Sequence, residues 1–178
     1  MALSGGAAVF VDKDGTLVHD VPYNVDPARV ALAEGAAEAV ERFALGGYRV
    51  IVVSNQPGVA LGLFERSRLA AVEERLQALL GGKLDGFYFC PHAPQAGCAC
   101  RKPGPGLLLQ AAREHGVDLA RSWMVGDILD DIEAGRRAGC RTCLVDNGNE
   151  TEWHLTEARR PHRIAADMRQ AAAWILNA

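Results

Sequence analysis

The feature that most constrains the fold is an alternation of short apolar runs, rich in β-branched residues, with longer stretches of helical spacing. In residues 34–45, for example, Val40 and Phe43 recur on one helical face before two glycines end the pattern. This alternation predicts an α/β fold, a doubly wound parallel sheet with helices on both faces. We expect strands at residues 7–11, 48–53, 86–90, 122–125 and 141–145, and helices at 34–45, 65–80, 106–115, 130–138 and 164–176.

The length of the chain predicts one domain. Its 178 residues fit a single compact unit, and we expect one domain over residues 1–178. Only about thirty residues separate the loop after the first strand from the second strand, a span that one crossover fills. There is no room at that point for an inserted cap domain. A loop rich in Pro, Gly and Cys at residues 90–102 is the irregular insertion that we expect.

The charge balance excludes some classes of partner. The formal net charge is −3 and no run of Lys or Arg is present, which argues against nucleic acid or an anionic membrane as the main partner. A small anionic substrate stays compatible, because a local pocket can be positive on an acidic protein. No apolar stretch is long enough to span a bilayer, and the apolar run at residues 7–11 is too short for a secretory signal. We therefore expect a cytoplasmic protein, and we expect a monomer.

The first candidate segment is Asp12-Lys13-Asp14-Gly15-Thr16, directly after the first predicted strand. Ligands of open α/β sheets bind outside the carboxyl ends of the strands. Two carboxylates two residues apart can divide the work of a reaction, because one can attack phosphorus while the other moves protons. Alone, the segment is as compatible with a solvated Asp-Gly turn as with an active site.

Two further segments offer groups that bind anions. Ser54, Asn55 and Gln56 follow the second strand and could hold phosphate oxygens, although Ser and Asn also favour caps and turns. Lys102 could neutralise a phosphate together with a nucleophilic carboxylate, and Arg101 could bind a second anionic group. Surface Lys and Arg are common, so neither segment indicates a site by itself.

The fourth segment contains Gly126 and Asp127, after the strand at residues 122–125. Mg²⁺ prefers oxygen ligands and often takes only one or two carboxylates, and Asp12 with Asp127 would form such a pair if their strands are adjacent. Asp130 and Asp131 are equally explained as charges in the first turn of a helix. All four segments follow a predicted strand or lie on loops at one edge of the sheet, which chance rarely produces.

The combination resembles the haloacid dehalogenase superfamily of phosphatases over roughly residues 7 to 147. Its D-x-D-G-T/V motif is similar to residues 12–16, its Ser/Thr motif to Ser54, its lysine to Lys102 and its G-D-x-x-x-D motif to residues 126–131. The resemblance implies that Asp12 is the nucleophile and forms an aspartyl-phosphate, while Asp14 is the general acid and base. It also implies Mg²⁺ held by Asp12, the backbone carbonyl of Asp14 and Asp127. Candidate phosphate and substrate contacts are Thr16, Ser54, Asn55, Gln56, Arg101 and Lys102.

Three of the five cysteines and one histidine form a metal-ligand pattern in one short stretch. Cys90, His92, Cys98 and Cys100 supply three thiolates and one imidazole, which complete the tetrahedral coordination of Zn²⁺. With no position left open, this would be a structural site. The alternative is a set of unrelated buried cysteines, which four ligands within eleven residues make the weaker explanation. Cys140 and Cys143 lack such neighbours and are expected to be ordinary core residues.

The zinc loop narrows the resemblance to two capless groups, the D-glycero-D-manno-heptose-1,7-bisphosphate 7-phosphatases and the histidinol-phosphate phosphatases. The stretch at residues 54–64 looks more like the heptose group, in which the residue matching Arg101 helps to bind the substrate beyond the reacting phosphate. Three positions depart from the pattern. Lys13 stands where Arg is usual, Leu61 where the heptose group usually has Arg, and Ile128 where a polar residue is common.

Two other functions were weighed. A mutase, which transfers phosphate to another acceptor, must exclude water, and no cap segment is evident. A catalytically silent binding module stabilised by zinc predicts that at least one of the four motif residues is missing, whereas all are present. The resemblance therefore implies a phosphatase that removes the 7-phosphate of a heptose 1,7-bisphosphate, with histidinol phosphate or another small sugar phosphate as the alternative substrate.

Overall fold

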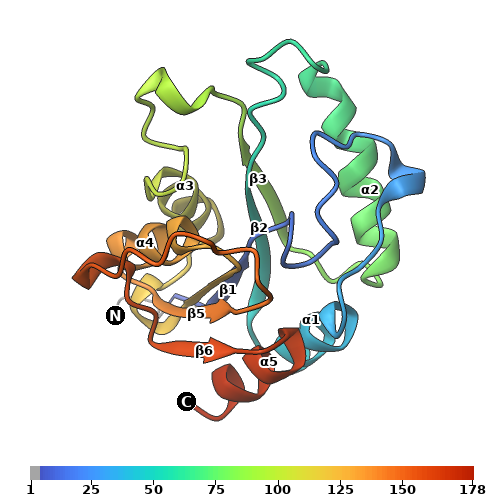
Figure 1. Ribbon diagram of the computed structural model, residues 1–178. Coiled ribbons are helices and arrows are strands. Elements are labelled where there is room, and N and C mark those ends of the chain that lie inside the picture. Colours follow the sequence, from blue (N-terminus) through green and yellow to red (C-terminus); the bar gives the residue numbers. More distant parts are fainter. Residues whose placement is uncertain (1–4) are drawn as a thin grey trace.

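The computed structural model describes residues 5–178 and shows a six-stranded, fully parallel sheet between two layers of helices (Figure 1). The strands are β1 Ala8–Val11, β2 Arg49–Asn55, β3 Gly86–Cys90, β4 Trp123–Gly126, β5 Arg141–Val145 and β6 Arg163–Ala165. The α-helices are α1 Ala36–Leu45, α2 Leu69–Leu79, α3 Gly106–His115, α4 Leu129–Ala138 and α5 Met168–Leu176. Short 3₁₀ helices occur at Pro27–Arg29, Arg66–Arg68, Pro94–Ala96, Leu119–Arg121 and Glu157–Arg159.

Alternate residues of the central strands face the two helical layers. Val9 and Val11 of β1 lie in the larger core cluster, with apolar side chains of α1, α2 and α5. Phe10 lies in the opposite cluster, with side chains of α3 and α4. Figure 1 shows the same division, with α3 and α4 on one side of the sheet and α1, α2 and α5 on the other. The predicted doubly wound sheet is therefore confirmed.

The strand order β3-β2-β1-β4-β5-β6 brings the candidate segments to one edge. Val11 at the end of β1 pairs with Val52 of β2 on one side and with Val125 of β4 on the other. The backbone N–H of Asp12 donates to the carbonyl of Val125 at 2.9 Å. The loop that begins at Asp12, the predicted nucleophile, is called the nucleophile loop below, and it therefore starts beside the end of β4. Successive strands are added on one side of β1 up to β3 and on its other side from β4, and open α/β sheets bind ligands at such a switch point.

The one wrong element prediction concerns residues 164–176. The structure divides them into β6 and α5, since Ile164 pairs with Leu144 of β5 and Asp167 then caps α5 by accepting from the N–H of Gln170 at 2.8 Å. A three-residue edge strand is too short to show an alternating pattern, so its apolar residue was counted with the helix. β2 is also longer than expected and includes Ser54 and Asn55.

The helix predicted at residues 65–80 begins later than expected. Its first turn is the 3₁₀ helix Arg66–Arg68, and α2 continues from Leu69. Among the described residues, no helix is both long and apolar enough to cross a membrane.

Candidate active site and metal centres

The nucleophile loop after β1 is a tight turn packed against Asp127. The N–H of Gly15 donates to the carbonyl of Val18 at 2.8 Å, and the N–H of Leu17 donates to that of Lys13 at 3.0 Å. Gly15 has φ +86°, and a Cβ atom there would lie 2.2 Å from Oδ2 of Asp127. Only glycine both adopts this conformation without strain and leaves room for the carboxylate.

Three buried carboxylates converge at this edge of the sheet. Asp12, Asp127 and Asp131 each place one oxygen so that the three atoms lie within 4.8 Å of one another. Asp12 and Asp127 are only 7% and 4% exposed, and Asp131 is fully buried. Burial raises the pKa of Asp12 well above its ordinary value, the attraction of Lys102 opposes the shift, and the neighbouring carboxylates add to it. Burial, followed by the charge of Asp131, likewise raises the pKa of Asp127.

Lys102 is the cation that compensates part of this charge. Its Nζ atom donates to Oδ1 of Asp12 at 2.6 Å, to Oδ1 of Asp131 at 2.7 Å and to the carbonyl of Val53 at 2.9 Å. All three N–H groups of the buried ammonium are therefore used. Burial opposes the charged form, but the two carboxylates outweigh it and raise the pKa of Lys102 above its ordinary value. The lysine stays charged beside Asp12 at neutral pH.

The end of β2 positions both Lys102 and Asp14. Asn55 donates from Nδ2 to the carbonyl of Lys102 at 3.1 Å and accepts from its N–H at Oδ1, at 3.0 Å. Gln56 donates from Nε2 to Oδ2 of Asp14 at 3.0 Å and to Oγ of Ser54 at 2.8 Å. Lys13 pairs with the other oxygen of Asp14. The proposed acid and base is thus held from both sides, half-exposed to the cavity.

A cavity of about 290 Å³ lies over these groups. It is large enough for a phosphoryl group with part of its leaving group, and it is open to solvent. Its acidic lining, with one buried cation, has the oxygen donors that a divalent cation requires. The lining residues are Asp12, Asp14, Asp20, Asn55, Lys102, Asp127, Ile128, Asp131 and Asn149.

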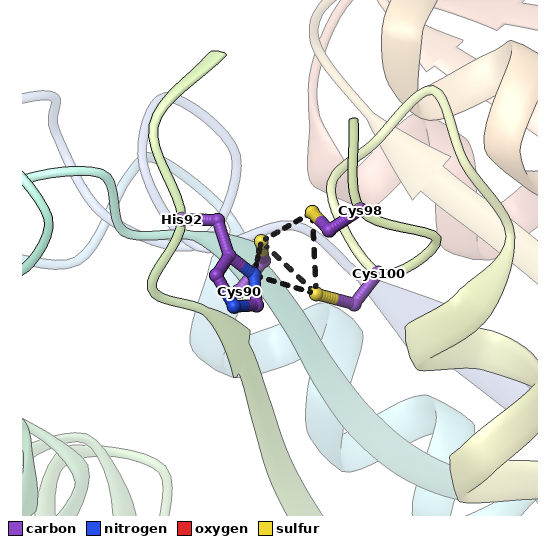
Figure 2. A group of neighbouring side chains, drawn as sticks. All are labelled: Cys90, His92, Cys98 and Cys100. Atoms are coloured by element: carbon purple, nitrogen blue, oxygen red, sulfur yellow. Dashed lines mark hydrogen bonds between the residues drawn. The ribbon is translucent and has the colours of Figure 1, made fainter. Parts of the chain in front are cut away.

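The zinc loop places its four predicted ligands together. Cys90 ends β3, and Figure 2 shows the sulfur atoms of Cys98 and Cys100 and the ring of His92 turned toward it. The separations run from 3.1 Å between the sulfurs of Cys90 and Cys100 to 3.6 Å between those of Cys98 and Cys100. The Nδ1 atom of His92 lies 3.2 Å from Sγ of Cys100 and 3.4 Å from Sγ of Cys90.

These distances fit a metal better than a disulfide. Tetrahedral Zn²⁺ keeps its sulfur and nitrogen ligands about 3.5 to 3.8 Å apart, whereas bonded sulfurs are about 2.0 Å apart. Burial raises the pKa of Cys90 to about 12, and hydrogen bonds from neighbouring thiols add to the shift. A cation shared by the four groups would stabilise the thiolates, and the set leaves no position open for a substrate.

Comparison with known proteins decides the family. The HAD-hydrolase-like family model matches residues 99–171. The D-glycero-beta-D-manno-heptose-1,7-bisphosphate 7-phosphatase of Bordetella bronchiseptica is 38% identical over 174 residues, which cover 94% of this chain and 97% of that relative. The chain belongs to the haloacid dehalogenase superfamily, in the family of these phosphatases.

A second relative and a solved structure support the same assignment of the chain to the haloacid dehalogenase superfamily. The D-glycero-D-manno-heptose-1,7-bisphosphate 7-phosphatase of Thermosynechococcus vestitus is 38% identical, and the match covers 94% of each of the two chains. A crystal structure of the D,D-heptose 1,7-bisphosphate phosphatase from B. bronchiseptica, complexed with magnesium and phosphate, has a TM-score of 0.82 at 32% identity. That likeness covers 96% of this chain and 98% of the other. The superfamily, its α/β fold and the class of phosphoric monoester hydrolase expected from the sequence are thereby confirmed.

Some residues of the superfamily motifs have other partners than the sequence suggested. Thr16, expected to contact phosphate, is buried and donates from Oγ1 to Oδ1 of Asp127 at 2.9 Å. Ser54 is also buried and accepts from Gln56. Neither lines the cavity over Asp12. Arg101 lines a neighbouring cavity of about 440 Å³ together with Lys102 and Arg137.

Two further residues, Asp131 and Asn149, contribute to the haloacid dehalogenase site. Asp131 matches the second acid of the G-D-x-x-x-D motif, although the sequence explained it equally well as a charge in the first turn of a helix. Its carboxylate pairs with Lys102 and accepts from the N–H of Ile128 at 3.3 Å. Burial of this position follows from Gly126, where a Cβ atom would lie 2.2 Å from Oδ2 of Asp131. Asn149 lies in the loop after β5 and donates to Asp127. Polar residues that follow a strand at this edge of the sheet are the sequence feature that could have indicated it.

Proposed function

We propose that the protein hydrolyses the 7-phosphate of D-glycero-D-manno-heptose 1,7-bisphosphate. The observation that carries the proposal is the pair formed by Asp12 and the buried ammonium of Lys102, beside Asp127 and under an open cavity. A carboxylate so placed can approach phosphorus while the lysine compensates the charge that accumulates there. The names of relatives that match this chain over nearly its whole length support the choice of sugar.

The residues present fit a divalent cation. Asp12 and Asp127 would supply carboxylate oxygens, and Asp14 would supply its backbone carbonyl. The cluster contains three carboxylates, and Lys102 is the one lysine paired with them, so the negative charge is only partly compensated. A bound Mg²⁺ would neutralise phosphate oxygens and align the phosphoryl group for in-line displacement.

In the first step, a carboxylate oxygen of Asp12 attacks phosphorus and the bond from phosphorus to the sugar oxygen breaks. Asp14 gives its proton to the departing alkoxide, which leaves an aspartyl-phosphate on Asp12. In the second step, Asp14 takes a proton from water, the water oxygen attacks phosphorus, and the acyl-phosphate bond breaks to regenerate Asp12. Throughout, the ammonium of Lys102 compensates negative charge beside Asp12, and Asn55 holds the backbone of Lys102 in place.

We further propose a single catalytic domain over residues 1–178, without a cap, and a structural role for zinc. The segment between β1 and α1 contains one 3₁₀ helix, Pro27–Arg29, and isolated bridges, which supports the absence of a cap there. The zinc ligands end two residues before Lys102, so a metal that fixes this loop also fixes the lysine.

The test is phosphate release from a panel of phosphorylated metabolites in the presence of Mg²⁺. We expect the highest kcat/KM for heptose 1,7-bisphosphate, with one phosphate released from carbon 7. A higher kcat/KM for histidinol phosphate would overturn the choice of substrate but not the chemistry. Transfer to a sugar acceptor instead of water would indicate a mutase, and no turnover of any ester would indicate a binding module.

A further inference from the structure

The loop between β5 and β6, residues 146–162, reaches over the active site although much of it is exposed. It is attached to the first turns of α4 by charged groups. Glu150 accepts from the N–H of Leu129 at 2.7 Å, and Arg159 donates to Asp130 at 3.1 Å and to Glu133 at 3.0 Å. Since α4 begins two residues after Asp127, these contacts fix the loop relative to that carboxylate.

Two asparagine side chains of this loop point into the site. The Nδ2 atom of Asn149 donates to Oδ2 of Asp127 at 2.7 Å, and Nδ2 of Asn147 donates to the carbonyl of Gly15 at 2.7 Å. Gly148 between them has φ +88°, and Oδ1 of Asn147 accepts from the N–H of Asn149 at 3.3 Å. The resulting turn directs both amides toward the nucleophile loop and Asp127.

The carboxylate of Asp127 is held at both oxygens. Asn149 donates to Oδ2, and Thr16 donates to Oδ1 at 2.9 Å. A carboxylate has about four lone-pair directions, so these two bonds leave about two for a cation. Two donors on different oxygens also prevent the carboxylate from rotating. Both donors are neutral, so they orient the group without cancelling its charge.

Gly15 packs closely against both Asp127 and Asn149. A Cβ atom at Gly15 would lie 2.2 Å from Oδ2 of Asp127 and 2.7 Å from Nδ2 of Asn149. The amide therefore reaches the carboxylate next to the glycine of the nucleophile loop. Asn149 also lines the cavity that contains Asp12 and Lys102.

We propose that Asn149 is a positioning residue, which holds the Asp127 carboxylate in the orientation that binds the divalent cation. The inference rests on the proposed function, because it assumes that Asp127 binds Mg²⁺. Hydrogen bonds to a ligating carboxylate restrict its orientation, and their loss typically weakens metal binding about 10- to 100-fold.

The experiment measures Mg²⁺ affinity by calorimetric titration of the zinc-loaded protein in the absence of substrate. Asn149→Leu removes the donor at similar volume, and Thr151→Val removes a polar group from an exposed position of the same loop. We expect Asn149→Leu to weaken Mg²⁺ binding about tenfold, and Thr151→Val to leave it unchanged. Asn149→Gln, which keeps a donor, should restore part of the affinity. At saturating Mg²⁺, kcat of Asn149→Leu should approach that of the wild type.

Equal Mg²⁺ affinity in Asn149→Leu and Thr151→Val would overturn the proposal while leaving the proposed function intact. A second outcome would also overturn it. Asn149→Leu would lose Mg²⁺ affinity, the magnesium-free variant would melt at a lower temperature, and Asn149→Gln would not restore the affinity, a pattern that indicates general damage to the loop. A wild-type protein that binds no Mg²⁺ would overturn this inference together with the metal-dependent part of the proposed function.

Discussion

The side-chain amide of Asn55 pairs with the backbone of Lys102 in both directions, at 3.1 and 3.0 Å. This pair joins the end of β2 to the loop that carries the zinc ligands. It fixes the backbone of Lys102, whose ammonium donates to Asp12, the residue directly after β1. The position of Lys102 therefore depends on two supports, the side-chain amide of Asn55 and the loop with the four proposed zinc ligands.

Loss of the buried cation should destabilise the protein. We expect Lys102→Met to lower the free energy of unfolding by about 3 kcal/mol or more, because Asp12 and Asp131 lose their shared partner in a buried site. Urea denaturation without Mg²⁺ measures this. Lys83→Met is the control, since Lys83 makes only a partly exposed pair with Glu41 at 3.9 Å and should change stability by less than about 0.5 kcal/mol. Equal effects of both variants would contradict the role given to Lys102.

Substitution of the nucleophile should separate activity from folding. We expect Asp12→Asn to reduce turnover by about 10⁴-fold or more, because the amide cannot form the aspartyl-phosphate. Phosphate release with Mg²⁺ measures turnover, and circular dichroism should show a native fold. Asp146→Asn, an exposed acid after β5, is the matched control and should keep activity. Substantial turnover by Asp12→Asn would refute the assignment.

The raised pKa of Asp12 predicts that stability depends on pH, and Asp12→Asn can test this. The pKa of Asp12 is raised in the folded state, mainly by burial, so the folded protein binds a proton here more tightly than the unfolded chain. This carboxyl therefore favours folding at low pH, and its contribution is lost as pH rises through the folded pKa. Without Mg²⁺, Asp12→Asn should exceed the wild type in stability at neutral pH, and the difference should shrink as pH falls toward 4. Urea titrations at several pH values test this, and a difference that grows on acidification would contradict it.

Most of the fold was predictable because the strands are short, apolar and separated by clear helical spacing. β1, β3, β5 and α3 lie within one residue of their expected bounds. β6 was not predictable, since a three-residue edge strand depends on pairing with β5 rather than on its own pattern. The expected cytoplasmic location and monomeric state stay predictions.

The motifs indicated which residues would gather, but not how they would pair. The phosphate contacts expected of Thr16 and Ser54 stay predictions. In the structure, the hydroxyl of Thr16 donates to Asp127, and that of Ser54 accepts from Gln56. The G-D-x-x-x-D motif included Asp131, but its spacing could not show that the carboxylate is buried, because burial depends on packing against Gly126. Asn149 lies far from the motifs in sequence and is brought to Asp127 only by the path of residues 146–162. The roles assigned to the site residues stay predictions until variants are measured.

Removal of one zinc ligand should affect stability more than chemistry. We expect Cys98→Ser to lower the zinc content and the melting temperature, while kcat falls less, because the loop supports Lys102 without contacting the reacting phosphate. Elemental analysis of purified protein measures the metal. Cys140→Ser is the control, since Cys140 is a buried cysteine outside the cluster and should leave zinc content unchanged. Wild-type protein without zinc, and without loss of stability on chelation, would contradict the structural site.

The position of Arg101 predicts a difference between substrates. Its side chain lines the cavity next to that of Asp12, with Lys102 on the boundary of both, so it is placed for groups beyond the reacting phosphate. One guanidinium nitrogen of Arg101 is buried without a hydrogen-bond partner among the described residues. An anionic group of the substrate would satisfy it and add a charge-assisted bond, which is typically worth about 1.5 to 3 kcal/mol.

Arg101→Ala should therefore reduce kcat/KM for a sugar bisphosphate by about 10- to 100-fold, with most of the change in KM. A simple monophosphate ester, which has no second anionic group, should lose much less. Arg137→Ala is the matched control, because Arg137 lines the same cavity but already pairs with Glu133. Steady-state kinetics on both esters with the three proteins measure the effect. Equal losses on the bisphosphate and the monophosphate would show that Arg101 acts on the reacting phosphate or on the fold, because only a contact to the second group distinguishes the two substrates.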